Sequence, residues 1–471
     1  MASLDRNLRR DLENAVKKAR RVAEAGARQA VEQLAVGHHE PWSALSPDQR
    51  KLRNRLRAHG RQLGDKLDEK KGTQSIDRLA GECAYEHWHR LLFARFLAEN
   101  DLLVEPQSGM ALSLDECREL AREQSKDWLV LASDFAQRML PQIFRAGDPV
   151  LEVALPPEKR QELEAILEGL PREVFIADDS LGWVYQYWQT EQKEAVNASG
   201  NKIGADELSP ATQIFTEDYM VLFMLHNTIG AWWAARRRAD KQSLNLPGYE
   251  LTYLRAHENG APITGSFSGW PTAAKAFRML DPSMGSGHFL AFALPLLVAI
   301  RRVEDGLSVE DAVDAVLREN IFGLEIDPRC TQIAAFNLAM TAWRLGGRRE
   351  LPELNLACSG LGINAKKSAW IELAGDDGPA RQAMEELYTL FEQAPLFGSL
   401  IDPTRVGGTL LSASFERVLP HFEQAIAAER DDSTTELAVA ARGVAKAARI
   451  LGERFTLVWV PEILTAPFRK F

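Results

Sequence analysis

The chain has 471 residues, of which 45% are hydrophobic and 26% charged, and its formal net charge is −10. This apolar content supports a large buried core and excludes a chain that is disordered throughout, while the acidic balance excludes a protein that coats nucleic acid over its whole surface. The four cysteines are widely spaced and form no CxxC pair, which excludes a zinc ribbon and fits a reducing, cytoplasmic location.

No segment has the composition of a signal peptide or of a membrane span. The N-terminal residues are charged throughout and contain no apolar stretch. The longest apolar run, Phe289–Ile300, has twelve residues, whereas a helix needs about 20 to cross a bilayer. We therefore expect this run to be a buried helix, and we expect no membrane partner.

The first 78 residues are basic, although the chain as a whole is acidic. They contain 18 Lys and Arg against 11 Asp and Glu, and they are predicted to form an amphipathic helix over 1–35 and a basic helix over 46–71. A basic region in an acidic chain favours a polyanionic partner. The run Arg50–Arg61 is either a solvated helix face or a surface for phosphate groups.

Helices are also predicted in the next part of the chain. They cover 79–104, Asp115 to about Phe144, and 156–171, where prolines begin the helix. The aromatic cluster at 183–188 is more typical of a core than of a platform for stacking bases. This part of the chain is therefore expected to be an all-helical unit.

The pattern changes near residue 206, where strands begin to alternate with helices. Strands are predicted over 275–280 and 320–325, and a helix follows the second strand over 331–345. This alternation is typical of a parallel sheet flanked by helices. Residues 366–453 are predicted to be mostly helical.

The most informative segment is LDPSMGSGHFL at 280–290, which follows the first of these strands and begins a helix. Gly285 and Gly287 let the backbone approach a ligand closely, and the helix N-terminus offers free N–H groups to it. The third glycine of a dinucleotide-binding fingerprint is absent, because leucine stands in its place. Asp281 precedes the turn, where its carboxylate can pair with a cationic group. A tight turn with no ligand is the simpler alternative.

Two further segments point to the same kind of site. GLEIDP follows the second strand, and an acidic residue there, Glu325, can accept hydrogen bonds from ribose hydroxyls. Asp327 is expected to cap the next helix. Upstream, TQIFTEDYMVLFML contains Thr216, which is predicted to cap an apolar helix.

Together, the three segments resemble the S-adenosylmethionine site of N6-adenine DNA methyltransferases in which the cofactor motifs come first in the chain. DPSMGSGHF resembles their DPxxGSGxF signature, GLEIDP their second motif, and TQIFTEDYMVLFML the helix that precedes them. The wider resemblance, over 75–370, is to the large methyltransferases of BREX and DISARM phage-defence systems and to type IIG restriction enzymes. It implies an α/β fold with an incomplete Rossmann-like methyltransferase core, a helical N-terminal domain and a helical insertion.

The expected organisation has four parts. They are a basic helical N-terminal region at 1–78, a helical domain at 79–205, an S-adenosylmethionine-binding methyltransferase core at 206–365, and a helical insertion with a truncated fourth-strand region at 366–471. No metal site is predicted, because His87 and His89 lie two residues apart on a helix and face different directions.

The resemblance implies a set of cofactor-binding residues: Thr216, Asp281, Pro282, Gly285, Gly287, Glu325, Ile326 and Ser359. At the methionine end, Asp281 would face the amino group and Thr216 would contact the carboxylate. Gly285 and Gly287 would line the methionine and the ribose.

The remaining members would hold the nucleoside end. Glu325 would bind the ribose hydroxyls, and Ile326 would pack on the adenine. The family usually places a polar residue near the adenine after the third strand. No aspartate stands there, so Ser359 or Cys358 takes this place.

The family's catalytic motif is missing from the sequence. In the family, an Asn/Asp-Pro-Pro-Tyr/Phe segment after the fourth strand grips the target adenine, whose amino group is a poor nucleophile. A strand is predicted over 454–458, but Trp459 stands where the motif requires Asn. The only Pro-Pro pair in the sequence is Pro156-Pro157, which precedes the cofactor motifs. No catalytic residue is assigned after Val458. We expect the chain to be the N-terminal portion of a larger methyltransferase, cut by a frameshift or split near residue 458.

The resemblance implies a site-specific DNA adenine N6-methyltransferase of a restriction-modification or phage-defence system, dependent on S-adenosylmethionine, with weak or no activity in this chain alone. Contact with double-stranded DNA is expected to be weak or indirect, and other subunits of the defence system are the further partners expected. Two alternatives stay open. One is a non-catalytic cofactor-binding or assembly subunit that works with a separate catalytic chain, and the other is a methyltransferase for a small molecule or a protein.

Overall fold

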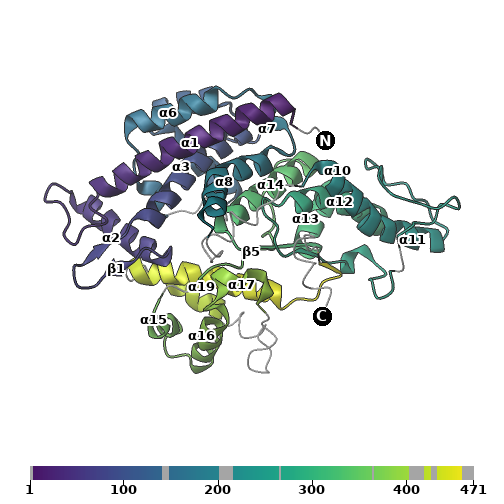
Figure 1. Cartoon of the computed structure of the whole chain (residues 1–471). Helices are drawn as coiled ribbons and strands as arrows, with labels where there is room; N and C mark the ends of the chain where they lie inside the picture. The colour runs from purple at the N-terminus through teal and green to yellow at the C-terminus, as the bar shows by residue number, and fades with distance from the viewer. Residues whose placement is uncertain are drawn as a thin grey trace.

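The computed structural model describes residues 4–140, 148–200, 216–264, 267–362, 365–401, 418–425 and 432–458. It is a helix-rich fold built around a small parallel sheet (Figure 1). Helices from the N-terminal half lie along one side of the molecule, and helices from the C-terminal part lie on the other side (Figure 1). This combination of helices with parallel strands confirms the expected α/β class.

The N-terminal half consists of helices and one short hairpin in its described residues. Its elements are α1 (Arg6–Gln33), α2 (Pro47–Gln62), β1 (Leu67–Asp68), β2 (Thr73–Gln74), α3 (Asp77–Glu99), α4 (Leu114–Glu123), α5 (Trp128–Met139), η1 (Pro149–Glu152), α6 (Pro157–Glu168), α7 (Glu173–Ile176) and α8 (Ser180–Ser199). The helix α1 packs along α3, α6 and α8 (Figure 1). Tyr185 and Trp188 of α8 are fully buried, which confirms that the aromatic cluster belongs to the core.

Two predicted helices are shorter than expected. The helix predicted over 46–71 ends with α2, because Gly64 adopts a positive φ of 101° and the chain then forms the β1–β2 hairpin. The helix predicted from Asp115 to about Phe144 is two helices, because the side chain of Asp127 caps a new start at α5. The end of that predicted range lies outside the described residues.

In the part of the chain that the structure describes, four short strands form the sheet, in the order β5-β4-β3-β6, and all neighbours are parallel. They are β3 (Met279–Asp281), β4 (Ile321–Glu325), β5 (Leu356–Cys358) and β6 (Leu457–Val458). The strand predicted over 275–280 begins late, because Ala274–Ala276 form a 3-10 turn. The fourth strand, predicted over 454–458, is present and pairs with β3.

Helices cover both faces of this sheet. One set comprises α12 (His288–Asp305), α13 (Val309–Glu319) and α14 (Pro328–Gly346), and the other α15 (Lys367–Glu372), α16 (Gly378–Phe391), α17 (Ala394–Phe397), η4 (Gly398–Leu400) and α19 (Asp432–Leu451). Side chains alternate along a strand: Met279 and Ile321 join the core of the first set, whereas Leu280 and Phe322 join the core of the second. The residues predicted as a helical insertion thus cover one face of the sheet.

The apolar run Phe289–Ile300 lies in α12, and most of its side chains are buried. This confirms the predicted buried helix. Within the ranges given above, no helix combines the length and the apolar character that crossing a membrane requires.

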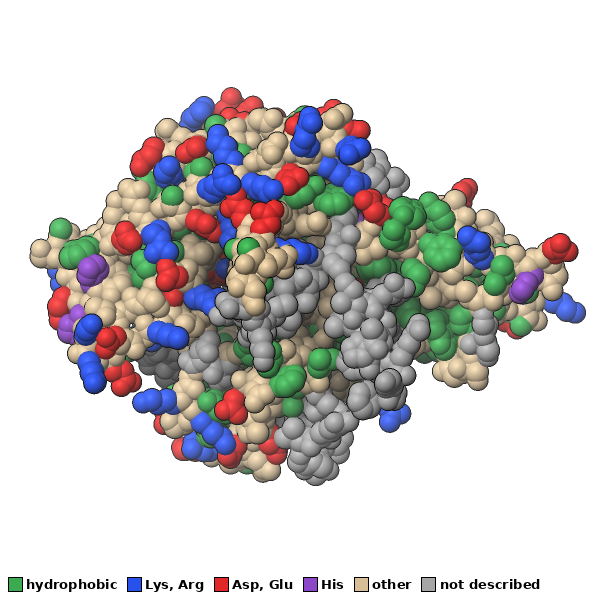
Figure 2. Space-filling view, in the orientation of Figure 1, with side chains coloured by type: hydrophobic (Ala, Val, Ile, Leu, Met, Phe, Trp, Pro, Cys, Tyr) green, Lys and Arg blue, Asp and Glu red, His purple; other side chains and the backbone are tan. Residues whose placement is uncertain are grey.

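A second apolar helix is buried on one side only. The elements before β3 are α10 (Asp218–Leu225), the π-helical turn η2 (His226–Gly230) and α11 (Ala231–Ala239). Val221 and Leu225 of α10 are fully buried, whereas Tyr219 and Phe223 are exposed. Figure 2 shows hydrophobic side chains gathered over this end of the molecule. The helix therefore packs on α12 and presents its other face to the surface.

The basic helix α2 uses its arginines inside the protein. Arg53 is only 4% exposed and donates to the carbonyl oxygens of Ala35, His38 and His39, which follow the end of α1. Burial lowers the pKa of Arg53. Arg57 donates to carbonyls of the same loop. The interpretation of Arg50–Arg61 as a phosphate-binding surface is therefore wrong for these arginines, because backbone carbonyls already occupy their donors.

Replacing Arg53 by methionine keeps an apolar stem but removes the guanidinium group from three carbonyl oxygens. We expect the free energy of unfolding to fall by about 2–3 kcal/mol, because these carbonyls lose charged donors. Thermal unfolding measures the change. Lys51→Met, at an exposed position of the same helix, is the control and should have little effect. Equal melting temperatures for the two variants would contradict the structural role of Arg53.

Candidate functional site

Two carboxylates lie at the carboxyl ends of the two central strands. Asp281 is the last residue of β3 and Glu325 is the last residue of β4, and Asp281 lies opposite Gly323 in the parallel pair. Parallel strands end at the same edge of a sheet, so the two side chains share that edge. Asp281 is 2% exposed and Glu325 is 7% exposed. The strand register thus places two acidic groups together with little water around either.

Backbone N–H groups surround the Glu325 carboxylate. It accepts hydrogen bonds from Gly285 at 2.7 Å, from Ile326 at 2.8 Å and from Asp327 at 3.1 Å. The contact with Gly285 ties the end of β4 to the glycine turn that follows β3. Burial raises the pKa of Glu325 to about 7, although the backbone donors oppose the shift.

Asp281 has less support from its own chain. The backbone N–H of Ser283 donates to it at 3.2 Å. Burial, and then the negative charge of Glu325, raise the pKa of Asp281 to about 7. Burying a carboxylate costs free energy unless it is paired. Asp281 is therefore suited to receive a positively charged group at this edge.

The two glycines of the turn differ in their surroundings. Gly285 has a φ of +54°, and a side chain there would meet no atom within 4 Å. Gly287 has a φ of +74°, and a Cβ atom there would lie 2.9 Å from the Cβ atom of Ala334 on α14. The open cradle predicted at this turn therefore lies at Gly285. Gly287 is needed for close packing of the turn on α14, which the sequence motif alone did not indicate.

Thr216 lies next to the start of α10 but does not cap it. The N-cap residue is Glu217, and its side chain makes no capping hydrogen bond, so the predicted capping role of Thr216 is wrong. Glu217 instead pairs with Arg9 of α1 at 3.1 Å, and Asp218 lies 3.1 Å from the Nε2 atom of His288 at the start of α12. These contacts hold the segment of Thr216 near the helix that begins at the glycine turn.

The adenine end of the predicted pocket has an apolar and a polar member. Ile326 is partly exposed. Ser359 is fully buried, and its backbone N–H and hydroxyl both donate to the carbonyl oxygen of Glu325, at 2.7 and 3.2 Å. The thiol of Cys358 lies 3.4 Å from the carbonyl oxygen of Ile326. Both polar side chains proposed near the adenine are thus engaged with backbone carbonyls, Ser359 at the last residue of β4 and Cys358 at the residue after it.

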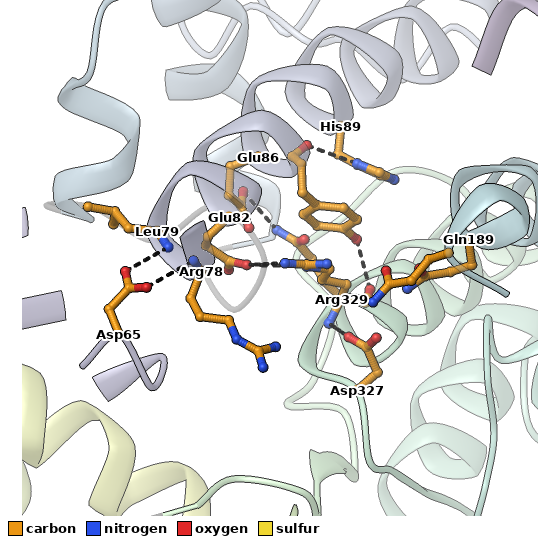
Figure 3. A network of polar contacts seen from close by, with 12 residues as sticks. Asp65, Arg78, Leu79, Glu82, Glu86, His89, Gln189, Asp327 and Arg329 are labelled. Carbon is orange, nitrogen blue, oxygen red and sulfur yellow. Dashed lines mark hydrogen bonds and ion pairs between the residues drawn. The ribbon is translucent and has the colours of Figure 1, made fainter. Parts of the chain in front are cut away.

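A polar network connects this loop to the N-terminal helices (Figure 3). Asp327 caps α14 through the N–H of Arg329, as predicted, and accepts a hydrogen bond from the hydroxyl of Tyr185. Gln189 of α8 donates to the same hydroxyl at 2.7 Å, and Arg329 donates to Glu82 of α3 at 3.2 Å. No local spacing in the sequence could have linked α3 and α8 to this loop, because the partners are far apart along the chain.

The segment after the fourth strand, where the family carries its catalytic motif, begins at Trp459 and lies outside the described residues. The sequence prediction that no catalytic residue follows Val458 therefore stays a prediction.

Gly287→Ala should destabilise the protein more than an ordinary glycine substitution at positive φ. The new Cβ atom would meet Ala334 in addition to the backbone strain, and we expect a loss of about 3 kcal/mol or more. Gly306→Ala is the matched control, because Gly306 has a φ of +68° and no atom within 4 Å of its would-be side chain; it should cost about 1 kcal/mol. Similar melting temperatures for both variants would refute the close packing.

Asp281→Asn should stabilise the free protein above neutral pH. Burial raises the pKa of Asp281 to about 7 in the folded protein, whereas in the unfolded chain it is about 4. The charged carboxylate therefore destabilises the folded protein fully above pH 7. This cost shrinks as the pH falls and is gone near pH 4. We expect the melting temperature of the variant to exceed that of the wild type by a few degrees at pH 8 and to match it near pH 4. A variant that is less stable at pH 8 would show that this carboxylate is already well paired.

Two solved structures have a slight likeness to the chain. One is a cryoEM structure of a DrdV–DNA complex, with 14% identity, a TM-score of 0.33, and coverage of 76% of this chain and 26% of that one. The other is a nuclease-deletion mutant of the Type ISP restriction-modification enzyme LlaGI in complex with a DNA substrate mimic, with 14% identity, a TM-score of 0.30, and coverage of 83% and 23%. TM-scores of this size do not establish a shared fold.

No family model matches the sequence, but two curated proteins are similar to it. The chain is 26% identical over 456 residues to the adenine-specific methyltransferase BrxX of Escherichia coli O9:H4 (strain HS), a match that covers 84% of this chain and 36% of BrxX. It is 26% identical over 211 residues to the adenine-specific methyltransferase PglX of Lacticaseibacillus casei (strain Zhang), covering 43% of this chain and 17% of PglX.

The matched part thus spans about a third of the length of BrxX and a smaller share of PglX. The names of both relatives confirm the resemblance inferred from the motifs. Over most of its length, the chain is similar to adenine-specific methyltransferases.

Proposed function

We propose that this chain forms the S-adenosylmethionine-binding part of a site-specific DNA adenine N6-methyltransferase of a restriction-modification or phage-defence system, on a Rossmann-like core. The observation that carries the proposal is the pair of buried carboxylates, Asp281 and Glu325, on either side of an open glycine turn at the carboxyl edge of a parallel sheet. The names of the two relatives support the adenine-specific reaction.

The strand order supports a ligand at this edge. Along the chain β3, β4 and β5 succeed one another in one direction across the sheet, and β6 then joins the other side of β3. In open α/β sheets, ligands bind outside the carboxyl ends of the strands at the point where the order reverses. Asp281 and the glycine turn lie at that point.

The residues fit the methionine end of the proposed cofactor. A buried carboxylate with one described backbone donor suits the ammonium group of the amino acid, and binding that group would compensate the cost of burying Asp281. The absence of a side chain at Gly285 leaves room beside it. Thr216, at the start of α10, is our proposed contact for the methionine carboxylate.

The residues at the nucleoside end also fit the cofactor, but Glu325 has room for one ribose hydroxyl rather than two. A carboxylate offers about four acceptor positions, and backbone N–H groups take three on Glu325. We propose that the remaining position accepts a ribose hydroxyl, and that the adenine lies on Ile326. Pro282 and Gly287 would fix the course of the turn that carries these contacts.

When bound, S-adenosylmethionine supplies a methyl group that is activated by its sulfonium centre. The residues of this chain then have two tasks, which are to bind the cofactor in one orientation and to exclude water around the buried carboxylates. Double-stranded DNA is the proposed substrate, and further subunits of a defence system are proposed partners.

A second candidate function is a non-catalytic cofactor-binding or assembly subunit. It is favoured by one observation, the lack of an Asn/Asp-Pro-Pro-Tyr/Phe motif in the 471 residues. Transfer of labelled methyl groups to DNA by the 471-residue chain, alone and mixed with a separate chain that carries the motif, distinguishes the two. We expect little or no transfer by the chain alone, whereas clear transfer would show that another segment grips the base.

Calorimetry with S-adenosylmethionine tests the cofactor site. For the wild type we expect a dissociation constant on the order of 1–10 µM, and for Asp281→Ala at least a tenfold weaker one, because the ammonium group loses a charged partner. Asp376→Ala, at an exposed acidic position outside the site, should bind like the wild type. Equal affinity of wild type and Asp281→Ala, or no binding by the wild type, would overturn the proposal.

A further inference from the structure

Two tyrosines of the helical N-terminal half hold the loop that follows β4. Tyr85 lies on α3 and Tyr185 lies on α8, and both are fully buried. The hydroxyl of Tyr85 donates to the backbone carbonyl of Arg329 at 2.9 Å, and the hydroxyl of Tyr185 donates to the carboxylate of Asp327. Two aromatic residues of the core thus use their polar ends to fix the few residues that follow Glu325.

Asp327 is held through its side chain and its backbone at the same time. One of its carboxylate oxygens accepts from the N–H of Arg329 at 2.9 Å, and the other accepts from Tyr185. Its own backbone N–H donates to the carboxylate of Glu325 at 3.1 Å. A shift of the Asp327 side chain would therefore disturb a donor of the Glu325 carboxylate.

The hydroxyl of Tyr185 is itself oriented from within α8. Gln189 lies one turn further along the helix, is only 3% exposed, and donates to the hydroxyl oxygen at 2.7 Å. Because Gln189 approaches as a donor, the single proton of the hydroxyl is directed to Asp327. The donors thus form one chain, from Gln189 through Tyr185 to Asp327, and from the N–H of Asp327 to Glu325.

An ion pair anchors the same loop at a second point. The guanidinium group of Arg329 donates to Glu82 of α3 through its Nε and Nη2 atoms, both at 3.2 Å (Figure 3). Both side chains are largely shielded from water, which makes such a charged contact stronger than an exposed one. The loop therefore stays attached to the N-terminal helices when the hydroxyl of Tyr185 alone is removed.

We propose that Tyr185 is a positioning residue of the cofactor site. Its hydroxyl fixes Asp327, and Asp327 fixes the orientation in which the carboxylate of Glu325 accepts a ribose hydroxyl. This inference rests on the proposed function, because it concerns the same ribose contact. Through Tyr185, the helical N-terminal half takes part in cofactor binding, although it contains none of the cofactor motifs.

Calorimetric titrations with S-adenosylmethionine, adenosine and 2′,3′-dideoxyadenosine test the proposal. The dideoxy compound lacks both ribose hydroxyls, so the ratio of the two adenosine affinities reports the contact with Glu325. We expect the wild type to bind adenosine at least tenfold more tightly than dideoxyadenosine. Tyr185→Phe keeps the ring and should lower this ratio about fivefold, because the supporting contacts of Glu325 loosen. Tyr187→Phe also removes a hydroxyl from α8, but its ring stacks on Trp183. It is the matched control and should keep the wild-type ratio.

A double-mutant cycle shows whether Tyr185 acts through Asp327. Asp327→Asn keeps a side chain that can cap α14, but it removes the charge that the hydroxyl of Tyr185 meets. In this background, the loss caused by Tyr185→Phe should shrink from about fivefold to about twofold or less, because the two residues act as one unit. An unchanged loss would refute the route through Asp327.

The outcomes separate this inference from the proposed function. If the wild type fails to bind S-adenosylmethionine, the proposed function fails. If the wild type binds it and Tyr185→Phe keeps the wild-type ratio of adenosine affinities, the cofactor site stands and the role of Tyr185 is refuted. Equal affinity of the wild type for both adenosines would refute the ribose contact and this role with it. Circular dichroism shows whether each variant is folded. If Tyr185→Phe is not, Gln189→Met, which removes the donor to the same hydroxyl, decides the question and should lower the same ratio.

Discussion

Two carboxylates buried side by side at one edge of a parallel sheet are the constraint on which this structure depends. Three backbone N–H groups stabilise Glu325, and one of them, that of Gly285, also ties the glycine turn to β4. Asp281 has one described donor and carries a raised pKa. The free protein therefore retains an uncompensated electrostatic cost at Asp281, and a ligand with a positive charge would relieve it. Binding and stability are thus expected to oppose each other at this residue.

The surrounding structure keeps that edge in place from three directions. Arg9 and His288 hold the start of α10 beside the glycine turn. Tyr185 connects the loop after β4 to α8, and Arg329 connects it to Glu82 of α3 (Figure 3). On the other face of the sheet, the region after β5 packs α16 and α19 on the strands and brings Gly398 to Ile326. The site is therefore a product of the whole fold, including the parts that its motifs do not cover.

Local patterns were enough to predict the centre of the site. Asp281 and Glu325 end two strands that the alternation of short apolar strands with helices indicates, and Gly285 follows the first of them. Such segments fold as the pattern says because the sheet is buried. The role of Arg53 was not predictable, since it depends on contacts with a separate segment, the loop that follows α1. The two alternatives left open for the arginines of α2 could not be decided for this reason: a basic run has the same composition whether it faces solvent, DNA phosphates or, as Arg53 and Arg57 do here, the carbonyl groups of a neighbouring loop.

The account can be tested most directly by counting the protons released when S-adenosylmethionine binds. With the pKa values of Asp281 and Glu325 near 7, the free site holds protons at pH 6, and pairing Asp281 with an ammonium group should expel about one of them. Calorimetry at pH 6 in buffers with different ionisation enthalpies measures this number. We predict release of about one proton by the wild type and much less by Asp281→Asn. A binding enthalpy that is the same in every buffer for the wild type would contradict the account.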